Sequence, residues 1–174
     1  MRRVRYHVAA SLDGYIADTE GGADWIVHDA EMDFAALFAQ FDTFLIGRRT
    51  FEFMARAGRE RIPGAKMIVF SRTLRQEDWP GVTVVADGVE ETVAALRGEE
   101  GKDIWLFGGG SLFRSLLDAG LVDTVEIAVI PVLLGGGTPL LSPPARQTKL
   151  KLTGQRVYKS GIVLLEYSVR KDDA

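Results

Sequence analysis

The chain has 174 residues, of which 47% are hydrophobic, and its 21 basic and 24 acidic side chains give a net charge of -3. This size predicts one domain, residues 1–174, with a sizeable core, and the mixed charge argues against a nucleic-acid partner. The absence of cysteine excludes disulfides, two histidines predict no metal site, and no apolar run approaches the ~20 residues of a membrane helix, so we expect a cytoplasmic protein with no membrane partner.

Eight segments are apolar or alternate between apolar and polar residues, which predicts strands. They are residues 4–12, 43–47, 66–71, 82–86, 104–107, 122–131, 150–158 and 162–169. Helical spacing appears between the early strands, over residues 34–41, 89–96 and 112–117. We therefore predict an α/β fold with a mixed, mostly parallel eight-stranded sheet, helices on both of its faces, and an antiparallel C-terminal hairpin that turns at residues 158–161.

The first strand ends in a turn that contains Asp13 and Gly14, which is a common β-turn pair. The small Ala9 lies just before this turn, so a flat ring could lie against the strand. A glycine-rich segment with Trp25 follows and suits a loop over a site, or a plain connection. We assign Asp13 and Trp25 as candidate substrate residues.

Acidic residues, among them Asp29 and Glu31, precede the first predicted helix. Acids at this position usually cap a helix or interact with its dipole. One of them could instead donate a proton if it turned inward. Asp29 and Glu31 are the candidate catalytic residues.

The next two strands each end in a turn with a cation. Gly47, Arg48, Arg49 and Thr50 follow the strand at 43–47 and start a helical stretch, where cations oppose the helix dipole and favour an anionic partner. Ser71 and Arg72 follow the strand at 66–71. The alternative is solvated surface arginines, but in a parallel sheet both turns open on the same carboxyl edge, which favours a shared ligand.

Three glycines stand between the strand at 104–107 and the next helical pattern. Glycine lets backbone amides approach phosphate oxygens closely, and a helix N-terminus favours an anion. The alternative is a flexible connection. The pattern is neither a Rossmann fingerprint nor a P-loop, because Phe113 stands at the final glycine position and no Gly-Lys-Ser/Thr ending follows. A second triple glycine, 135–137, suits a structural turn or a subunit contact as well as a ligand.

Five motifs in this order resemble the dihydrofolate reductase-like superfamily, in particular the RibD C-terminal domain family (riboflavin-biosynthesis reductases) and its small stand-alone members. They start at Val8, Gly47, Phe70, Phe107 and Pro131 and cover nearly the whole chain. The resemblance implies an eight-stranded sheet that binds NADPH across its carboxyl edge. It implies that Ala9 and Ile16 flank the nicotinamide, that Arg48, Arg49, Ser71 and Arg72 serve the 2′-phosphate side, and that Thr50 with Gly108, Gly109, Gly110, Ser111 and Leu112 holds the pyrophosphate. Gly47 belongs to the same set of cofactor-binding residues.

The resemblance also implies the activity. We expect an NADPH-dependent reductase similar to 5-amino-6-(5-phosphoribosylamino)uracil reductase, which transfers hydride to a small heterocyclic or sugar-derived imine or carbonyl. The stretch that begins at Phe51 departs from the substrate motif of the riboflavin reductases. A pteridine or dihydrofolate-type reductase and a non-catalytic NADPH-binding protein are the alternatives. Relatives are often dimers, and the apolar segment 122–134 suggests a homodimer here.

Overall fold

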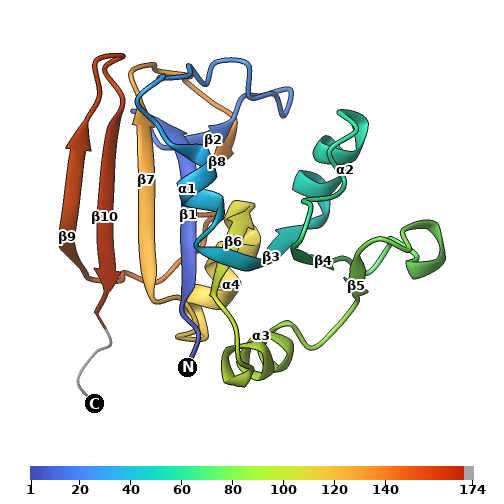
Figure 1. Ribbon diagram of the computed structural model, residues 1–174. Helices are drawn as coiled ribbons and strands as arrows, with labels where there is room; N and C mark the ends of the chain where they lie inside the picture. The colour runs from blue at the N-terminus through green and yellow to red at the C-terminus, as the bar shows by residue number, and fades with distance from the viewer. Residues whose placement is uncertain (171–174) are drawn as a thin grey trace.

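The computed structural model describes residues 1–170, and Figure 1 shows its elements. The strands are β1 (Val4–Ser11), β2 (Tyr15–Ala17), β3 (Phe41–Gly47), β4 (Lys66–Phe70), β5 (Thr83–Val85), β6 (Asp103–Gly108), β7 (Thr124–Ile130), β8 (Thr138–Pro139), β9 (Leu150–Val157) and β10 (Val163–Val169). The helices are α1 (Phe34–Phe38), α2 (Arg48–Arg56), α3 (Val89–Gly98) and α4 (Gly110–Asp118), with a 3-10 turn, η1 (Gln76–Asp78).

The main sheet has eight strands in the order β5-β4-β3-β6-β1-β7-β10-β9. The first six in this order run parallel, whereas β10 is antiparallel to both β7 and β9. The predicted mixed sheet and its C-terminal hairpin are therefore confirmed. Because the six strands are parallel, the turns that follow them all open at one edge of the sheet.

Helices cover both faces of the sheet, as predicted. On β3, Leu45 packs with α3 and α4, while its neighbours Phe44 and Ile46 pack with α1 and α2. This alternation follows from the two-residue period of a strand. Two apolar layers thus enclose the central strands, and both α2 and α4 begin directly at the carboxyl edge, after Gly47 and Gly109.

One prediction at the level of single elements was wrong, and two short strands were missed. The helical spacing over 34–41 extends too far, since α1 ends at Phe38 and Phe41 already pairs with Asp103 of β6. Sheet pairing overrides helical spacing at that residue. The sequence also gave no indication of β2 and β8, which pair only with each other and are three and two residues long. Elements this short carry no periodic signal.

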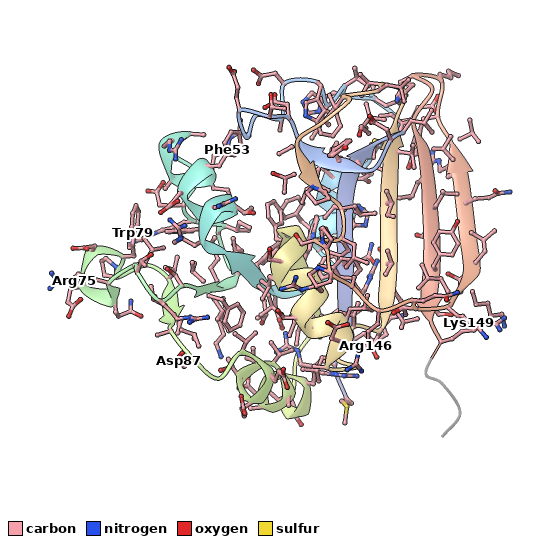
Figure 2. All side chains as sticks on the ribbon, turned by 180° about the vertical axis from the view of Figure 1, so that it is seen from behind. Phe53, Arg75, Trp79, Asp87, Arg146 and Lys149 are labelled. Carbon is pink, nitrogen blue, oxygen red and sulfur yellow. The ribbon has the colours of Figure 1, made fainter. Side chains whose placement is uncertain are left out.

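On the face seen from behind in Figure 2, no helix within residues 1–170 lies over the β9–β10 hairpin. On β9, Leu152 is 49% exposed and Val157 is 72% exposed. The segment 122–134, in contrast, contains β7, which lies between β1 and β10 in the middle of the sheet. Its apolar character therefore reflects burial within the sheet, and the uncovered apolar side chains belong to the hairpin. No helix among the described residues has both the length and the apolarity to span a bilayer.

Candidate functional site

The turns that follow β3 and β6 touch each other at the carboxyl edge of the sheet. Ile46 and Gly108 are register partners across these two strands. A Cβ atom at Gly47 would lie only 3.3 Å from the Gly108 oxygen and the Gly109 nitrogen. The Gly108–Gly109 peptide bond is cis. The two predicted binding turns thus form one continuous surface of backbone.

Side chains from two other elements frame this backbone. A Cβ atom at Gly109 would lie 3.5 Å from Thr50 Oγ1 of α2 and 3.8 Å from Ile16 Cδ1 of β2. The structure therefore brings Ile16, Thr50 and the glycine turn together, although these residues lie up to 93 positions apart in the sequence. The backbone between Thr50 and Ile16 stays accessible because glycine adds no side chain there.

The first turn of α4 supplies free donors beside this turn. No side chain caps the helix at Gly109. Because the first amides of a helix have no intrahelical acceptor, the amides of Ser111 and Leu112 are available to an anion. These donors and the uncapped helix suit the pyrophosphate group that the sequence predicted for this turn.

The four predicted cofactor residues on the 2′-phosphate side differ in their surroundings. Arg48 forms an ion pair with Glu52 inside α2, at 3.1 Å. Ser71 is buried, and its Oγ accepts the amides of Thr73 at 3.2 Å and Leu74 at 3.0 Å. Ser71 therefore shapes the turn after β4.

Arg49 and Arg72 are exposed, and neither forms an ion pair in the part of the chain that the structure describes. They follow β3 and β4, which are neighbouring strands. Exposed guanidinium groups without a carboxylate partner can bind a phosphate without losing an existing ion pair. Of the predicted cations, these two are the best placed for an anionic ligand.

Asp13 anchors one loop to another. Its carboxylate accepts hydrogen bonds from Ser11 Oγ at 2.7 Å, from the Leu134 amide at 3.0 Å and from the Gly135 amide at 2.7 Å. The hydrogen bond from Ser11, together with those from Leu134 and Gly135, lowers the pKa of Asp13 to about 2. Its role as a substrate residue stays a prediction, since both of its oxygens already hold the loop.

The second triple glycine completes this connection between the loops. A Cβ atom at Gly137 would overlap the carbonyl oxygen of Ala17, and one at Gly110 would overlap that of Pro139. The short β2–β8 ribbon therefore packs directly on the start of α4. These contacts place Ile16 over the glycine turn, so residues 135–137 serve as a structural turn in this chain.

The candidate catalytic acids lie against the turn of the β9–β10 hairpin. Asp29 accepts the amides of Glu31 at 2.8 Å and Ser160 at 3.0 Å, and Glu31 forms an ion pair with Lys159 at 3.0 Å. Hydrogen bonding to Ser160 lowers the pKa of Asp29. A proton donor must hold its proton at the working pH, which a lowered pKa opposes. Their catalytic role stays a prediction without a supporting contact.

Ala9 and Trp25 do come together. Both pack in the small cluster around Ala128 and Ile130, and Met32 packs there as well. The Trp25 indole also donates a hydrogen bond to the Gly22 carbonyl, at 3.1 Å. The loop that carries Trp25 thus packs on the same cluster as Ala9, and its role over a binding site stays a prediction.

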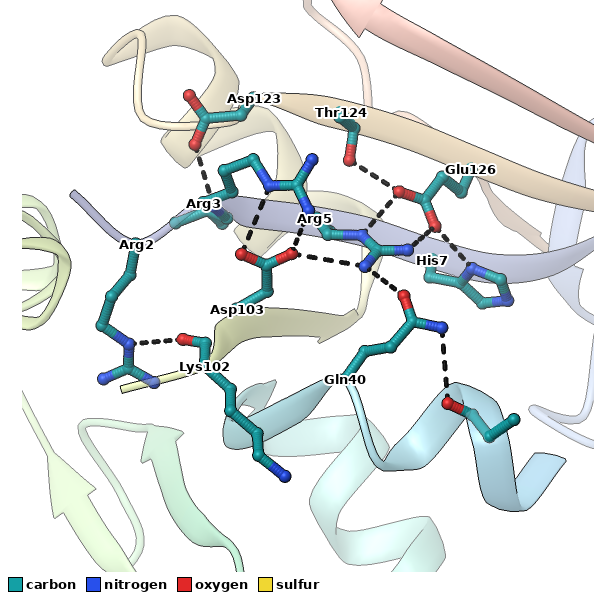
Figure 3. Close-up of polar contacts among 12 residues, drawn as sticks. Arg2, Arg3, Arg5, His7, Gln40, Lys102, Asp103, Asp123, Thr124 and Glu126 are labelled. Carbon is teal, nitrogen blue, oxygen red and sulfur yellow. Dashed lines mark hydrogen bonds and ion pairs between the residues drawn. The ribbon is translucent and has the colours of Figure 1, made fainter. Parts of the chain in front are cut away.

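Sequence reasoning missed a second polar region, on the face of the sheet that α1 covers. A hollow of about 200 Å³, which we call the α1 hollow, is lined by His7 and Glu126 of the sheet, Phe34 and Leu37 of α1, and Arg156 and Tyr158 of the hairpin, among others. Its floor is a buried ion pair: Arg5 Nε and Nη2 donate to the two oxygens of Glu126, each at 2.7 Å (Figure 3). The only sign of this region in the sequence is the presence of charged residues, Arg5 and Glu126, inside otherwise apolar strands.

Glu126 is ionised in this setting. Burial alone would raise its pKa, but hydrogen bonds from His7 and Arg5 outweigh burial and lower the pKa of Glu126 to about 2. Thr124 adds a further hydrogen bond, from Oγ1 to Oε1 at 2.8 Å. The carboxylate is therefore held in one place by three neighbours.

The sequence and the fold both match known proteins. The family described as "RibD C-terminal domain" matches residues 2–164. An uncharacterized protein of Bacillus subtilis, YyaP, is 34% identical over 178 residues, which cover 95% of this chain and 94% of that protein. Both comparisons extend over almost the whole chain, so the similarity is not limited to a single motif.

Solved structures give the same fold. A putative riboflavin biosynthesis protein from Shewanella sp. PV-4 superposes with a TM-score of 0.83 and 26% identity over 98% of this chain and 100% of that one. Dihydrofolate reductase from Enterococcus faecalis, complexed with NADP(H), superposes with a TM-score of 0.71 and 21% identity over 97% of both chains. The predicted dihydrofolate reductase-like fold is confirmed.

Proposed function

The chain belongs to the RibD C-terminal domain family, and from this premise we propose that it is an NADPH-dependent reductase. It would transfer hydride to a small heterocyclic or sugar-derived imine or carbonyl, as 5-amino-6-(5-phosphoribosylamino)uracil reductase does in riboflavin biosynthesis. The observation that carries the proposal is the meeting of Gly109, Thr50 and Ile16 at the start of an uncapped helix. A cytoplasmic location and a homodimer stay predictions.

The residues at this edge fit a phosphorylated dinucleotide. The bare backbone at Gly109 and the free amides of α4 suit the pyrophosphate, and Arg49 and Arg72 suit a further phosphate on the adenosine side. Ile16 lies next to the same backbone and offers an apolar wall for a nicotinamide ring. When bound, NADPH would supply a hydride to an electrophilic carbon.

The protein's own contribution would be position and exclusion of water. The Asp13 anchor and the β2–β8 ribbon hold Ile16 over Gly109, which fixes one wall of the ring site. The loop with Trp25 and Met32 packs on the same cluster as Ala9 of β1, so it would limit the access of water to that part of the strand. Fixed orientation of two reactants can lower the barrier by about 7–11 kcal/mol.

A non-catalytic NADPH-binding protein is the second candidate. It is favoured by the surroundings of Asp29 and Glu31, since both acids are engaged by the β9–β10 turn. Such a protein would bind NADPH but would not oxidise it with any acceptor. Binding and turnover therefore have to be measured separately.

A fluorescence titration with NADPH and, separately, NADH tests the proposal, with Trp25 and Trp105 as reporters. We expect saturable binding and a clear preference for NADPH. Because a charge-assisted hydrogen bond contributes about 1.5–3 kcal/mol, Arg49→Ala or Arg72→Ala should weaken NADPH binding by at least about tenfold and leave NADH binding unchanged. Arg75→Ala, at a side chain that is 73% exposed and paired with Glu77, is the matched control.

The outcomes separate the candidates. Absence of binding by either nucleotide would refute both the reductase and the binding protein. Binding without NADPH oxidation across a panel of cyclic imines and carbonyls would leave the binding protein. Equal loss of NADPH affinity in the Arg75→Ala control would show that the effect of the arginines is nonspecific.

A further inference from the structure

The α1 hollow holds an imidazole whose orientation is fixed. His7 Nδ1 lies 3.0 Å from Glu126 Oε2, and the ring stands edge-on to Trp105 with the ring centres 5.3 Å apart. The Trp105 indole also donates to the His7 carbonyl at 2.8 Å, which holds the backbone. Because Glu126 is an ionised acceptor, Nδ1 carries a hydrogen towards it. The exchangeable position is then Nε2, which has no partner among residues 1–170.

This histidine lies on the same face of β1 as Ala9. The two residues are two positions apart on the strand, which corresponds to about 6.6 Å. Met32, Tyr158 and Leu164 line the hollow and also pack in the cluster that contains Ala9. The hollow is therefore the direct continuation of the Ala9 site along the sheet. A single ring is long enough to extend from one to the other.

We propose that His7 Nε2 donates the proton that completes the reduction of a hydride acceptor held in the α1 hollow. This inference rests on the proposed reductase function. As the acceptor carbon of a C=N or C=O group gains a hydride, the double bond opens and its nitrogen or oxygen gains a proton. That proton leaves Nε2 of the protonated His7, and His7 regains a proton from water. Glu126 is a positioning residue, since it acts through His7.

The other groups in the hollow define the acceptor. The Arg156 guanidinium lies over the Tyr158 ring, 4.7 Å from its centre, and neither Arg156 nor Glu166 forms an ion pair in the described part of the chain. Asp33 faces the hollow too, but its carboxylate caps α1 through the Ala36 amide at 2.9 Å. One cation and one carboxylate thus remain available to a ligand.

A ligand that matches this pair has a hydrogen-bond acceptor on one edge and a donor on another. The volume of about 200 Å³ is below the ~300 Å³ at which pockets begin to hold drug-sized ligands. The hollow therefore has room for a single planar ring. The charged and titratable groups around His7 are Arg5 and Glu126 from the sheet, Asp33 from α1, and Arg156, Tyr158 and Glu166 from the hairpin.

Two measurements test the proposal, and the first needs no cofactor. The chain has only two histidines, so ¹⁵N-labelled imidazoles give two resolvable sets of NMR signals, and the exposed His28 is the internal control. On titration with 5-aminouracil, the His7 Nε2 signal should move and the His28 signals should not. His7→Gln should weaken binding of 5-aminouracil at least fivefold. Movement of neither histidine, or of both equally, would overturn the assignment of the hollow.

The second measurement is the pH profile of NADPH oxidation with an acceptor that the wild type reduces. General acids contribute roughly 10²–10⁴-fold, so His7→Gln should lower kcat at least 100-fold, remove the decline at alkaline pH and leave NADPH affinity unchanged. His28→Gln should match the wild type. A kcat within twofold of wild type in His7→Gln would refute His7 as the donor while the reductase function stands. If no acceptor is reduced, the proposed function fails, and the NMR titration still decides whether the hollow binds a ring.

Discussion

The buried Glu126 makes a specific prediction for stability against pH. Its pKa is about 2 in the folded protein and 4.5 in the reference state, so the carboxylate is more easily ionised when folded. A lowered folded pKa stabilises the protein above the unfolded value, and this contribution disappears as pH falls through the folded value. The window is therefore pH 4.5 down to pH 2. At 1.36 kcal/mol per unit, the contribution above this window is about 3 kcal/mol.

The assay is urea unfolding of wild type and Glu126→Gln at a series of pH values. At pH 6, Glu126→Gln should be less stable by about 3 kcal/mol, because Arg5 stays buried and keeps only Asp103, at 3.3 Å, as an ionic partner. The difference between the two proteins should shrink by about 3 kcal/mol between pH 6 and pH 2. Other carboxylates, such as Asp13 and Asp29, titrate in both proteins and therefore cancel in the difference.

Glu166→Gln is the matched control, because Glu166 also faces the α1 hollow but forms no ion pair among residues 1–170. Its stability should follow the wild-type pH dependence. A constant difference between wild type and Glu126→Gln from pH 6 to pH 2 would refute the reasoning. That result would mean that the bidentate contact to Arg5 does not favour the ionised carboxylate over the protonated one.

Two further predictions concern packing and assembly. Gly110→Ala should lower the free energy of unfolding by about 1–3 kcal/mol, because its Cβ would overlap the Pro139 carbonyl oxygen. Gly98→Ala has no atom within 4 Å of its Cβ, so it should leave the free energy of unfolding unchanged or raise it by up to ~1 kcal/mol. Equal values for the two variants in chemical unfolding would contradict this packing. We also predict a homodimer through the uncovered face of β9 and β10. Leu152→Lys should then shift the protein towards monomer in sedimentation velocity. Phe53→Lys, at an α2 side chain that is 43% exposed, should not. A wild type that is monomeric at every concentration would refute the homodimer.

The sequence predicted those parts of the fold that depend on local pattern. Apolar or alternating runs located all eight strands of the main sheet. The glycines at 108–110 were recognisable because they separate a strand from a helix, and their contact with Thr50 follows from the pairing of β3 with β6. A parallel sheet places such turns at one edge without further information.

The features that were missed depend on distant pairing. His7 and Glu126 are register partners on β1 and β7 and lie 119 positions apart, so no local pattern joins them. The anchor from Asp13 to Gly135 spans 122 positions. Asp29 and Glu31 were proposed as proton donors because acids near the first helix are visible in the sequence. The turn at Ser160, which engages Asp29, becomes their neighbour only when the hairpin folds back.

The buried ion pair also bears on how the site works. Taking Arg5 and Glu126 out of water costs several kcal/mol for each ion, and replacing such a pair with apolar side chains often stabilises a protein. Compared with apolar side chains of similar size, the pair is therefore a poor means of stabilising the sheet. What it does supply is a fixed, ionised oxygen at 3.0 Å from His7 Nδ1, and apolar side chains cannot supply this. The same carboxylate sets the tautomer of His7 and the direction of Nε2. The contact of Glu126 with Arg5 keeps the carboxylate ionised and in place, and its contact with His7 orients the proton donor beside Ala9.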